Sequence, residues 1–277
     1  MERKQIIITG GHSGIGLELT KLVLKENHRV GLILRNENTL GEAKKIIKQF
    51  NPADVDFFIA DLSDQESISA VAKSITDKWY KVDILFNNAG VLLREKMFSI
   101  QQNEMHNEIN TLAPHILTIA LHQALINAED AIVVNTATDG LNMMKKLKME
   151  ELINPMKFKK LLGSYLHSKL ALVLLMNNLA MEWQQQKIRI LNVSPGGNKT
   201  KLSMGSGMPS LLKPIVNLFY KNPIAGAKLL YEAGFGEKFK ENNGVFIQNN
   251  KIEKLKVVLG EEQKSALLKG IKTHVSR

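Results

Sequence analysis

Residues 5–25 read QIIITGGHSGIGLELTKLVLK, and they place a strand, a glycine-rich turn and a helix in direct succession. The β-branched run Gln5–Thr9 is typical of a strand that is buried on both faces. Gly10, Gly14 and Gly16 allow a close approach of the main chain to a ligand, and the helix that follows presents free N–H groups to a phosphate. The spacing differs from the commoner GxGxxG fingerprint, so a purely structural turn is the alternative. Its place between a strand and a helix predicts a pyrophosphate site.

Strands and helices continue to alternate along the chain. Further strands are predicted at Arg29–Leu34, Val55–Ala60, Asp83–Phe86, Ala131–Thr136, Ile188–Val193 and Gly244–Ile247, the last being the final strand. Helices are predicted at Leu40–Phe50, from Ser63 or Asp64 to about Trp79, at Asn222–Phe235 and, with a weaker periodicity, at Glu261–Ile271. This alternation predicts one doubly wound, Rossmann-like α/β domain over residues 1–277. The sheet would be mainly parallel, with helices on both faces and the ligand cleft at the strand carboxyl ends.

Composition narrows the class of protein. The 277 residues are 44% hydrophobic, which is enough for one substantial core, and the absence of cysteine excludes disulfides and thiolate chemistry. We identify no signal peptide, no membrane-spanning run and no metal-binding motif, and we therefore expect a cytoplasmic protein. The net charge of +10 suits an anionic ligand, although a generally lysine-rich surface explains it equally. Nucleic acid is the weaker alternative, and we predict no nucleic-acid partner.

The residues that follow the second and third strands bear on the choice of dinucleotide. An acidic residue after the second strand binds a ribose 2′-hydroxyl, whereas an arginine accommodates a 2′-phosphate. Arg35 stands there, which favours NADP(H) over NAD(H) unless Arg35 is merely a solvated charge. His12, inside the glycine turn, could approach the same phosphate. Asp61, after the third strand, could accept a hydrogen bond from an adenine amino group.

Residues 163–180, GSYLHSKLALVLLMNNLA, hold a candidate catalytic pair. Tyr165 and Lys169 are four residues apart and share one face of a helix. The pKa of a free tyrosine lies near 10, and an adjacent cation lowers it, which makes the phenol a usable general acid or base. A solvated tyrosine and lysine at helical spacing is the alternative interpretation of this pair.

Three motifs taken together resemble the short-chain dehydrogenase/reductase family. TGGHSGIG begins at Thr9, NNAG follows the strand that ends at Phe86, and YLHSK begins at Tyr165, in the order and spacing of that family. The resemblance extends from about Lys4 to at least Ala233. ILRN, NTLAPHILT, SYLHSKLALVLL and SPGGNKTKL are most similar to its branch of retinol dehydrogenases and relatives of protochlorophyllide reductase.

The resemblance implies roles for individual positions. Tyr165 matches the proton donor, Lys169 the residue that binds the nicotinamide ribose and lowers the tyrosine pKa, and Asn110 the asparagine that bends its helix and holds a water of the proton relay. The matching cofactor-binding positions are Gly10, Ser13, Gly14, Ile15, Asp61, Leu62, Asn88, Ala89, Gly90, Pro195, Gly196 and Thr200.

The strand Ala131–Thr136 and the residues after it depart from the family pattern. The family usually has two serines here, and the second donates a hydrogen bond to the substrate carbonyl. An ungapped alignment puts Thr136 and Ala137 at these positions, and alanine has no donor to offer. We expect a one-residue bulge that lets Thr138 supply the hydroxyl; Thr136 or a water is the alternative. Asn198 is a second departure, where the family has an aliphatic residue against the nicotinamide, and we expect little harm from it.

Two segments beside the expected cleft are rich in apolar and basic residues. Residues 141–164 form an insertion that the resemblance implies to be a helical flap, and its lysines are either a solvated face or an attraction for an acidic substrate. Residues 201–222 suggest a lid, whose apolar side chains would line a hydrophobic mouth: Leu211, Leu212, Ile215, Val216, Leu218 and Phe219. Residues 249–277 form a basic tail.

The sequence therefore predicts an NADP(H)-dependent oxidoreductase that interconverts a small hydrophobic carbonyl compound and its alcohol, with Tyr165 as the general acid or base. The alternative is an NADP(H)-binding regulatory or scaffold protein that is impaired in catalysis, and Ala137 is the feature that raises it. The apolar run Leu170–Met176 permits a homodimer, although it suits the interior of one chain equally.

Overall fold

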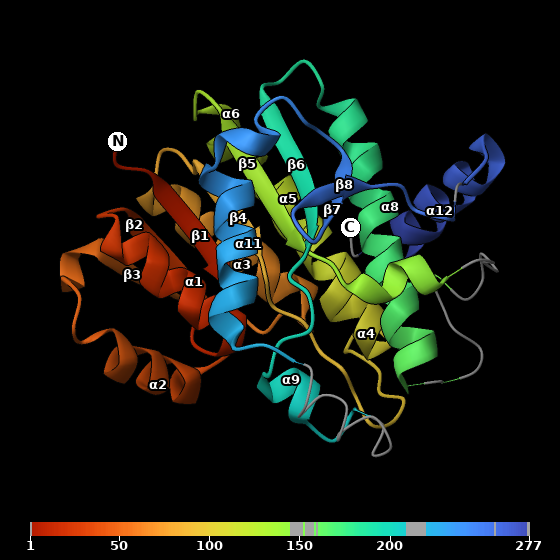
Figure 1. Cartoon of the computed structure of the whole chain (residues 1–277), viewed down its shortest axis with the longest axis horizontal. Coiled ribbons are helices and arrows are strands. Elements are labelled where there is room, and N and C mark those ends of the chain that lie inside the picture. Colours follow the sequence, from red (N-terminus) through yellow and green to blue (C-terminus); the bar gives the residue numbers. More distant parts are fainter. Residues whose placement is uncertain are drawn as a thin grey trace.

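Eight strands form one sheet, in the order β3-β2-β1-β4-β5-β6-β7-β8 (Figure 1). The computed structural model describes residues 2–144, 152, 158, 160–208, 220–257 and 259–275. The strands are β1 (Gln5–Thr9), β2 (Arg29–Leu34), β3 (Val55–Ile59), β4 (Ile84–Asn87), β5 (Ala131–Thr136), β6 (Ile188–Ser194), β7 (Val245–Gln248) and β8 (Lys251–Glu253). β1 to β7 pair in parallel, and β8 pairs antiparallel with β7. The strand order reverses direction between β1 and β4, which is where doubly wound sheets bind their ligands.

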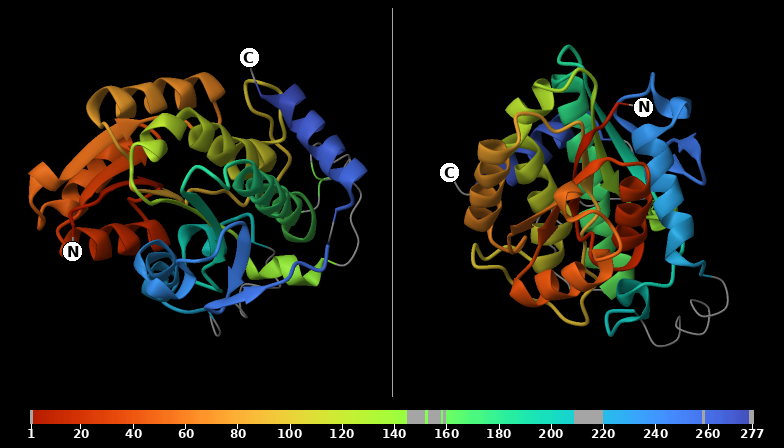
Figure 2. Two further views of the ribbon diagram at one scale, coloured as in Figure 1. Left: turned by 90° about the horizontal axis from the view of Figure 1, so that it is seen from above. Right: turned by 90° about the vertical axis from the view of Figure 1, so that its left-hand side faces the viewer.

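Helices cover both faces of this sheet (Figure 2). The α-helices are α1 (Gly14–Lys25), α2 (Glu37–Ile47), α3 (Gln65–Lys78), α4 (Met105–Asn107), α5 (Ala113–Ala120), α6 (His122–Ile126), α8 (Leu166–Glu182), α9 (Lys201–Met204), α11 (Pro223–Phe235) and α12 (Glu261–His274). Short 3-10 segments lie at η1 (Pro52–Asp54), η3 (Asp139–Met143) and η6 (Glu237–Phe239), and π-helical turns at η2 (Glu108–Leu112) and η4 (Lys160–Tyr165). Among the described helices, none combines the length and the apolar character that crossing a membrane requires.

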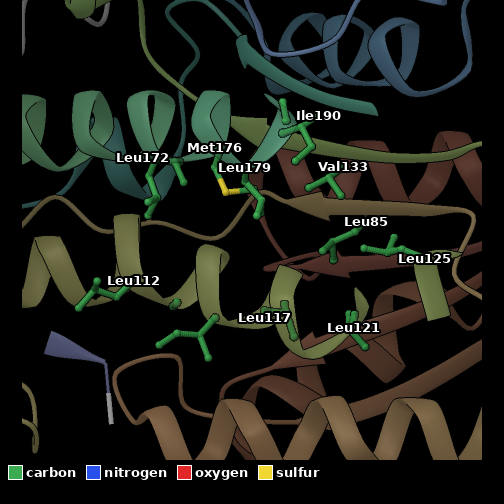
Figure 3. Packing of buried hydrophobic residues seen from close by; sticks show 14 of the residues in the cluster. Leu85, Leu112, Leu117, Leu121, Leu125, Val133, Leu172, Met176, Leu179 and Ile190 are labelled. Carbon is green, nitrogen blue, oxygen red and sulfur yellow. The ribbon is translucent and has the colours of Figure 1, made fainter. Parts of the chain in front are cut away.

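The alternation of side chains along each strand divides the core into two layers. In β1, Ile7 joins the cluster under α3, α5 and α8, whereas Ile6 and Ile8 join the cluster under α1, α2 and α11. Figure 3 shows the first layer, where Leu85 and Val133 of the sheet pack against leucines of α5 and α8. The central strands have continuous apolar runs in the sequence because both of their faces are buried.

Three asparagines form a polar rung across the sheet just below the strand ends. Asn87, Asn135 and Asn192 occupy the same register position on β4, β5 and β6. The Asn87 amide donates to Asn135 Oδ1 at 2.9 Å, and the Asn135 amide donates to Asn192 Oδ1 at 3.1 Å. These buried amides link the carboxyl ends of the three strands, although Asn87 Oδ1 itself has no partner among the described residues.

The predicted domain and its parallel sheet are confirmed, with strand and helix ends shifted by a few residues. One prediction was wrong: the strand near Gly244–Ile247 is not the last, because the turn at Asn249 and Asn250, both with positive φ, leads into β8. Residues 145–151, 153–157 and 159 of the predicted flap, and residues 209–219 of the predicted lid with all its named apolar side chains, lie outside the described residues.

Candidate active site

A cleft of about 1040 Å³ opens at the carboxyl ends of the strands. It is lined by every residue that we predicted to bind the cofactor and by three of the four that we predicted to be catalytic. These lining residues are Gly10, His12, Ser13, Gly14, Ile15, Arg35, Asp61, Leu62, Asn88, Ala89, Gly90, Pro195, Gly196 and Thr200, together with Tyr165, Lys169 and Thr138. Asn110, the fourth, lies buried behind the cleft wall. Segments that are up to 190 residues apart in the sequence thus meet in one site.

The glycine turn after β1 is a main-chain cradle. Gly10 and Gly14 have positive φ values of 67° and 54°, which L-residues with side chains rarely adopt. A Cβ atom on Gly16 would lie 2.3 Å from the carbonyl oxygen of Gly10, so the turn closes tightly on the start of α1. Ser13 is the N-cap of α1 and makes no side-chain cap hydrogen bond, which leaves the first N–H groups of the helix facing the cleft without that partner. These features fit a bound pyrophosphate.

Asn88 and Ala89 are held against β1 by Thr9, a residue that the sequence analysis did not single out. Thr9 Oγ1 accepts hydrogen bonds from the backbone nitrogens of Asn88 at 3.0 Å and Ala89 at 2.9 Å. The Asn88 amide returns a bond to the Thr9 carbonyl at 3.0 Å. The floor of the cleft between β1 and β4 is therefore fixed by one buried hydroxyl.

Arg35 and Asp61, which we predicted to contact opposite ends of an adenosine, are bonded to each other. Arg35 Nε lies 3.1 Å from Asp61 Oδ2 at the rim of the cleft. Burial acts to raise the pKa of the Asp61 carboxyl, but hydrogen bonds from Ser63 and the nearby Arg35 outweigh it and hold the pKa below its ordinary value. The pair brings a positive charge and a hydrogen-bond acceptor to the end of the cleft where an adenosine 2′-phosphate would lie.

Tyr165 and Lys169 point into the other end of the cleft from the start of α8. The π-helical turn η4 leads into α8 at Tyr165, and both side chains are buried. Burial raises the pKa of Tyr165 to about 12 and lowers the pKa of Lys169 to about 8. Lys169 Nζ donates to the Thr136 carbonyl at 2.7 Å, and burial dominates at the phenol. The lowering of the tyrosine pKa by Lys169 stays a prediction.

Thr138 lies beside Tyr165, and hydrogen bonding from its hydroxyl acts to lower the pKa of the phenol, against the larger effect of burial. The predicted bulge is not what achieves this: the β5–β6 register is regular up to Thr136, and Thr138 follows two residues later in an extended conformation. Ala137, buried between them, donates its backbone nitrogen to the Val193 carbonyl at 2.8 Å. Thr136 Oγ1 is buried and has no hydrogen-bond partner among the described residues. Thr138 is thus the threonine placed beside the phenol.

Asn110 lies in the π-helical turn η2, where the predicted bend of its helix is found. Its side chain accepts from the Val91 nitrogen at 2.8 Å, donates to the Val91 carbonyl at 3.0 Å and donates to Ser168 Oγ at 3.0 Å. It therefore ties the loop after β4 to the helix that carries Lys169. Gly90 lies close to both side chains, since a Cβ atom would meet Asn110 Oδ1 at 3.1 Å, which is a tight contact, and Lys169 Nζ at 3.4 Å.

The loop after β6 has an internal brace that the sequence analysis underestimated. Asn198 is buried; its amide donates to the carbonyls of Pro195 at 2.7 Å and Gly196 at 3.0 Å, and its oxygen accepts from the Gly226 nitrogen at 3.0 Å. Asn198 thus shapes this part of the cleft from within. The sequence shows that residue 198 is an amide and not an aliphatic residue. It does not show which groups the Asn198 side chain hydrogen-bonds.

Asp139 is a cleft-lining carboxylate that the sequence analysis missed. Ser194 Oγ donates to Asp139 Oδ1 at 2.5 Å. The charge of Asp139 also acts to raise the pKa of Tyr165 and of Tyr220, another cleft residue. The sequence feature that could have identified Asp139 is its position directly after Thr138.

The cleft as a whole combines a phosphate-binding turn, a basic rim and a cluster of buried hydroxyl and ammonium groups, which fits a dinucleotide and a reacting carbonyl.

Comparisons with known proteins agree with this geometry. Residues 4–147 match the family model of short chain dehydrogenases. Retinol dehydrogenase 12 of Mus musculus is 27% identical over 252 residues, which are 90% of this chain and 78% of the relative. Retinol dehydrogenase 11 of Mus musculus is 30% identical over 227 residues, or 81% of this chain and 71% of the relative. The NADPH-bound carbonyl reductase from chicken fatty liver shares the fold with a TM-score of 0.69, at 19% identity, covering 91% of this chain and 99% of that one.

Proposed function

The chain belongs to the short-chain dehydrogenase/reductase family, within its retinol dehydrogenase-like branch, and on this premise we propose that it is an NADP(H)-dependent oxidoreductase that interconverts a carbonyl compound and an alcohol. The observation that carries the proposal is the contact of Tyr165 with Thr138 beside the buried Lys169, in a cleft that also contains the glycine cradle. A carbonyl oxygen placed between the two hydroxyls would accept a hydrogen bond from each.

The protonation of Tyr165 suits its proposed role as a proton donor. With a pKa raised to about 12 by burial, the phenol keeps its proton throughout the neutral range and is ready to protonate a carbonyl oxygen. A bound NADPH supplies the hydride that the carbonyl carbon receives. Lys169, one turn after Tyr165 on α8, would return a proton to the phenol, and Asn110, which is tied to the same helix through Ser168, would hold the water of that relay. Reduction is therefore the proposed direction.

The proposal of NADP(H) rests on the charge at the adenosine end of the cleft. Arg35 is the guanidinium at the position that discriminates a 2′-phosphate from a free 2′-hydroxyl, and it is exposed at the rim. The chicken carbonyl reductase of the same fold holds NADPH. The cofactor would lie along Gly10–Ile15, the Asn88–Gly90 loop and the Pro195–Thr200 loop.

Other predictions concern the substrate, location and partners of the protein. A hydrophobic carbonyl substrate is supported by Leu92, Leu202 and Met208, which line the cleft. Exposed Ile119 and Met181 at the outer ends of α5 and α8 support a homodimer. The cytoplasmic location and the lack of a nucleic-acid partner stay predictions. The alternative of a catalytically impaired regulator rested on the missing donor at Ala137. The Thr138 hydroxyl beside the phenol argues against it, because it offers such a donor.

The decisive experiment follows oxidation of NADPH with a panel of aromatic and aliphatic aldehydes and ketones. We expect Tyr165→Phe to reduce kcat by at least about 10³-fold, because the proton donor is lost, while the Kd for NADPH changes less than about twofold. Tyr231→Phe is the matched control, since that hydroxyl lies on α11 outside the cleft-lining residues. Turnover that survives in Tyr165→Phe would refute the assignment of the proton donor.

The choice of cofactor has its own test. Arg35→Ala should weaken binding of NADPH by about tenfold and leave NADH nearly unchanged, because the lost charge would attract the 2′-phosphate that NADH lacks. Arg3→Ala is the matched control: Arg3 also forms an ion pair with an aspartate, Asp54, but at the amino ends of the strands, away from the cleft. Equal losses for the two dinucleotides in Arg35→Ala would contradict the proposed preference.

A further inference from the structure

The C-terminal helix α12 ends on a buried polar cluster beside the active site. The carbonyl oxygen of His274, its last residue, accepts hydrogen bonds from the amides of Gln65 at 2.8 Å and Asn103 at 3.0 Å. The His274 ring also contacts Asn103, with Nδ1 2.5 Å from Oδ1. A C-terminal helix carbonyl, which lacks a partner within its own helix, is thus satisfied by two side chains that are more than 170 residues away in the sequence.

The same two amides hold a fully buried carboxylate. Glu108 has 0% exposure, and its Oε1 accepts from Gln65 at 2.9 Å while its Oε2 accepts from Asn103 at 2.7 Å and from Ser99 Oγ at 2.8 Å. Each amide nitrogen therefore bridges Glu108 to the carbonyl of His274. A buried carboxyl group is tolerated when its oxygens are hydrogen-bonded in this way, and α12 takes part because its last carbonyl shares two of the donors.

Glu108 is the first residue of the π-helical turn that carries Asn110. One side of this turn is fixed through Glu108 to α3 and α12, and the other through Asn110 and Thr111 to α8, where Thr111 Oγ1 donates to the Ser168 carbonyl at 2.7 Å. Figure 1 shows α12 beside α8, and its apolar side is buried through Leu267 and Ile271. A π-turn is a less regular helix than an α-turn and needs external contacts to hold its register.

We propose that α12 is a positioning element of the active site: docked through Gln65 and Asn103 onto Glu108, it fixes the π-turn that sets the position of Asn110. Glu108 acts through Asn110 and touches neither substrate nor cofactor, so it is a positioning residue. The catalytic part of this inference rests on the proposed function, because the role of Asn110 in the proton relay belongs to that function. The docking itself rests on the hydrogen bonds alone.

The first test is Glu108→Gln, which keeps the size of the side chain and turns one acceptor into a donor. The new NH₂ group must face Gln65 or the Ser99–Asn103 pair, so Glu108 loses a hydrogen bond to one of the two amides that also bind the His274 carbonyl. We expect kcat to fall roughly tenfold, as for displacement of a positioned group by a fraction of an ångström, while KM for NADPH stays within about twofold. Glu262→Gln, on the exposed side of α12, is the matched control.

A double-mutant cycle separates positioning from general destabilisation. If Glu108 acts through Asn110, then Glu108→Gln should change kcat less than about twofold in an Asn110→Ala background. The same tenfold loss with and without Asn110 would overturn the proposal, and so would an unchanged kcat in Glu108→Gln alone.

Hydrogen exchange tests the docking without any turnover. Ile271→Asp buries a charge under α12 and should speed exchange of the amides of residues 108–112 at least about tenfold, whereas exposed Lys269→Asp should not. Unchanged exchange rates of the β1 amides in both variants would show that the fold is retained. If the wild-type protein binds NADPH but reduces no carbonyl, the proposed function fails. Faster exchange in Ile271→Asp would then still support the positioning of the π-turn, and unchanged exchange would overturn it.

Discussion

The two ends of the cleft are built from different parts of the polypeptide. The end near β1 and α1 is mostly main chain: positive-φ glycines, the free N–H groups of α1 and a loop held by the hydroxyl of Thr9. The end near β5 and α8 is mostly side chain, with Tyr165, Thr138 and Lys169 converging from separate elements. At the first end, the lack of side chains exposes main-chain groups to a ligand. At the second end, buried polar side chains supply the contacts.

This difference has an energetic consequence. A main-chain cradle adds little cost once the glycines are in place, because its N–H groups can be solvated until a phosphate binds. The catalytic end instead removes an ammonium group from water without a carboxylate beside it among the described residues, and it leaves the Thr136 hydroxyl without a partner there. Such groups lower the stability of the fold and persist because of function.

The largest effect that this comparison predicts lies at the catalytic end. Thr138→Val keeps the shape of the side chain and removes the donor beside Tyr165, and we expect kcat to fall about 10²-fold, as for loss of one oxyanion-type donor. Thr136→Val, at the end of β5 two residues earlier, is the matched substitution, and the Thr136 hydroxyl has no partner among the described residues. A larger loss of kcat in Thr136→Val than in Thr138→Val would assign the donor to Thr136 and contradict our reading of the site.

Much of the fold could be predicted because it follows from local patterns. The run Gln5–Thr9 is buried on both faces in the central part of the sheet, as its β-branched residues indicate, and β5 has the predicted bounds. β8 was missed because three exposed residues, Lys251–Glu253, carry no periodicity, and their pairing depends on the edge that β7 offers.

The candidate site divides in the same way. Positions that act through the main chain, such as Gly10 and Gly14, were predicted from residue type alone. The role of Thr138, the bond between Arg35 and Asp61 and the brace by Asn198 depend on which side chains meet across the fold, which spacing along the chain does not specify. The pKa of Tyr165 depends on burial as well as on its neighbour, so its direction could not be obtained from the motif.

A smaller effect is expected at the cofactor end. Gly16→Ala places a Cβ atom 2.3 Å from the Gly10 carbonyl oxygen and 2.4 Å from Asn88 Nδ2, so the turn has to open. We expect a loss of about 2–3 kcal/mol in the free energy of unfolding, with weaker binding of NADPH. Gly41→Ala lies within α2, where no described atom is within 4 Å of the new Cβ, and should instead gain about 0.5–1 kcal/mol. Urea unfolding of both variants checks the pair, and equal stabilities would show that the cradle is not closed by sterics.

The smallest predicted effect concerns the free-energy cost of burying Lys169. Removing this side chain should raise the stability of the fold while it lowers the activity. Burial lowers the pKa of Lys169 from its ordinary 10.5 to about 8. Below pH 8 the side chain is charged in both the folded and the unfolded chain, so the folded state bears the full cost of a buried ammonium. Between pH 8 and 10.5 the folded state has released the proton and the unfolded state still binds it, so this cost disappears as the pH rises.

Lys169→Met should therefore be more stable than the wild type at pH 7, while it loses turnover. We expect a gain of about 1–2 kcal/mol, less than the pKa change alone implies, because the hydrogen bond to the Thr136 carbonyl is lost as well. The gain should shrink as the pH is raised from 8 towards 10.5, and thermal melts of the two ligand-free proteins across that range measure it. A stability difference that stays constant with pH would mean that the ammonium is hydrated in the folded protein, and the catalytic end would then not bear the cost that distinguishes it from the glycine cradle.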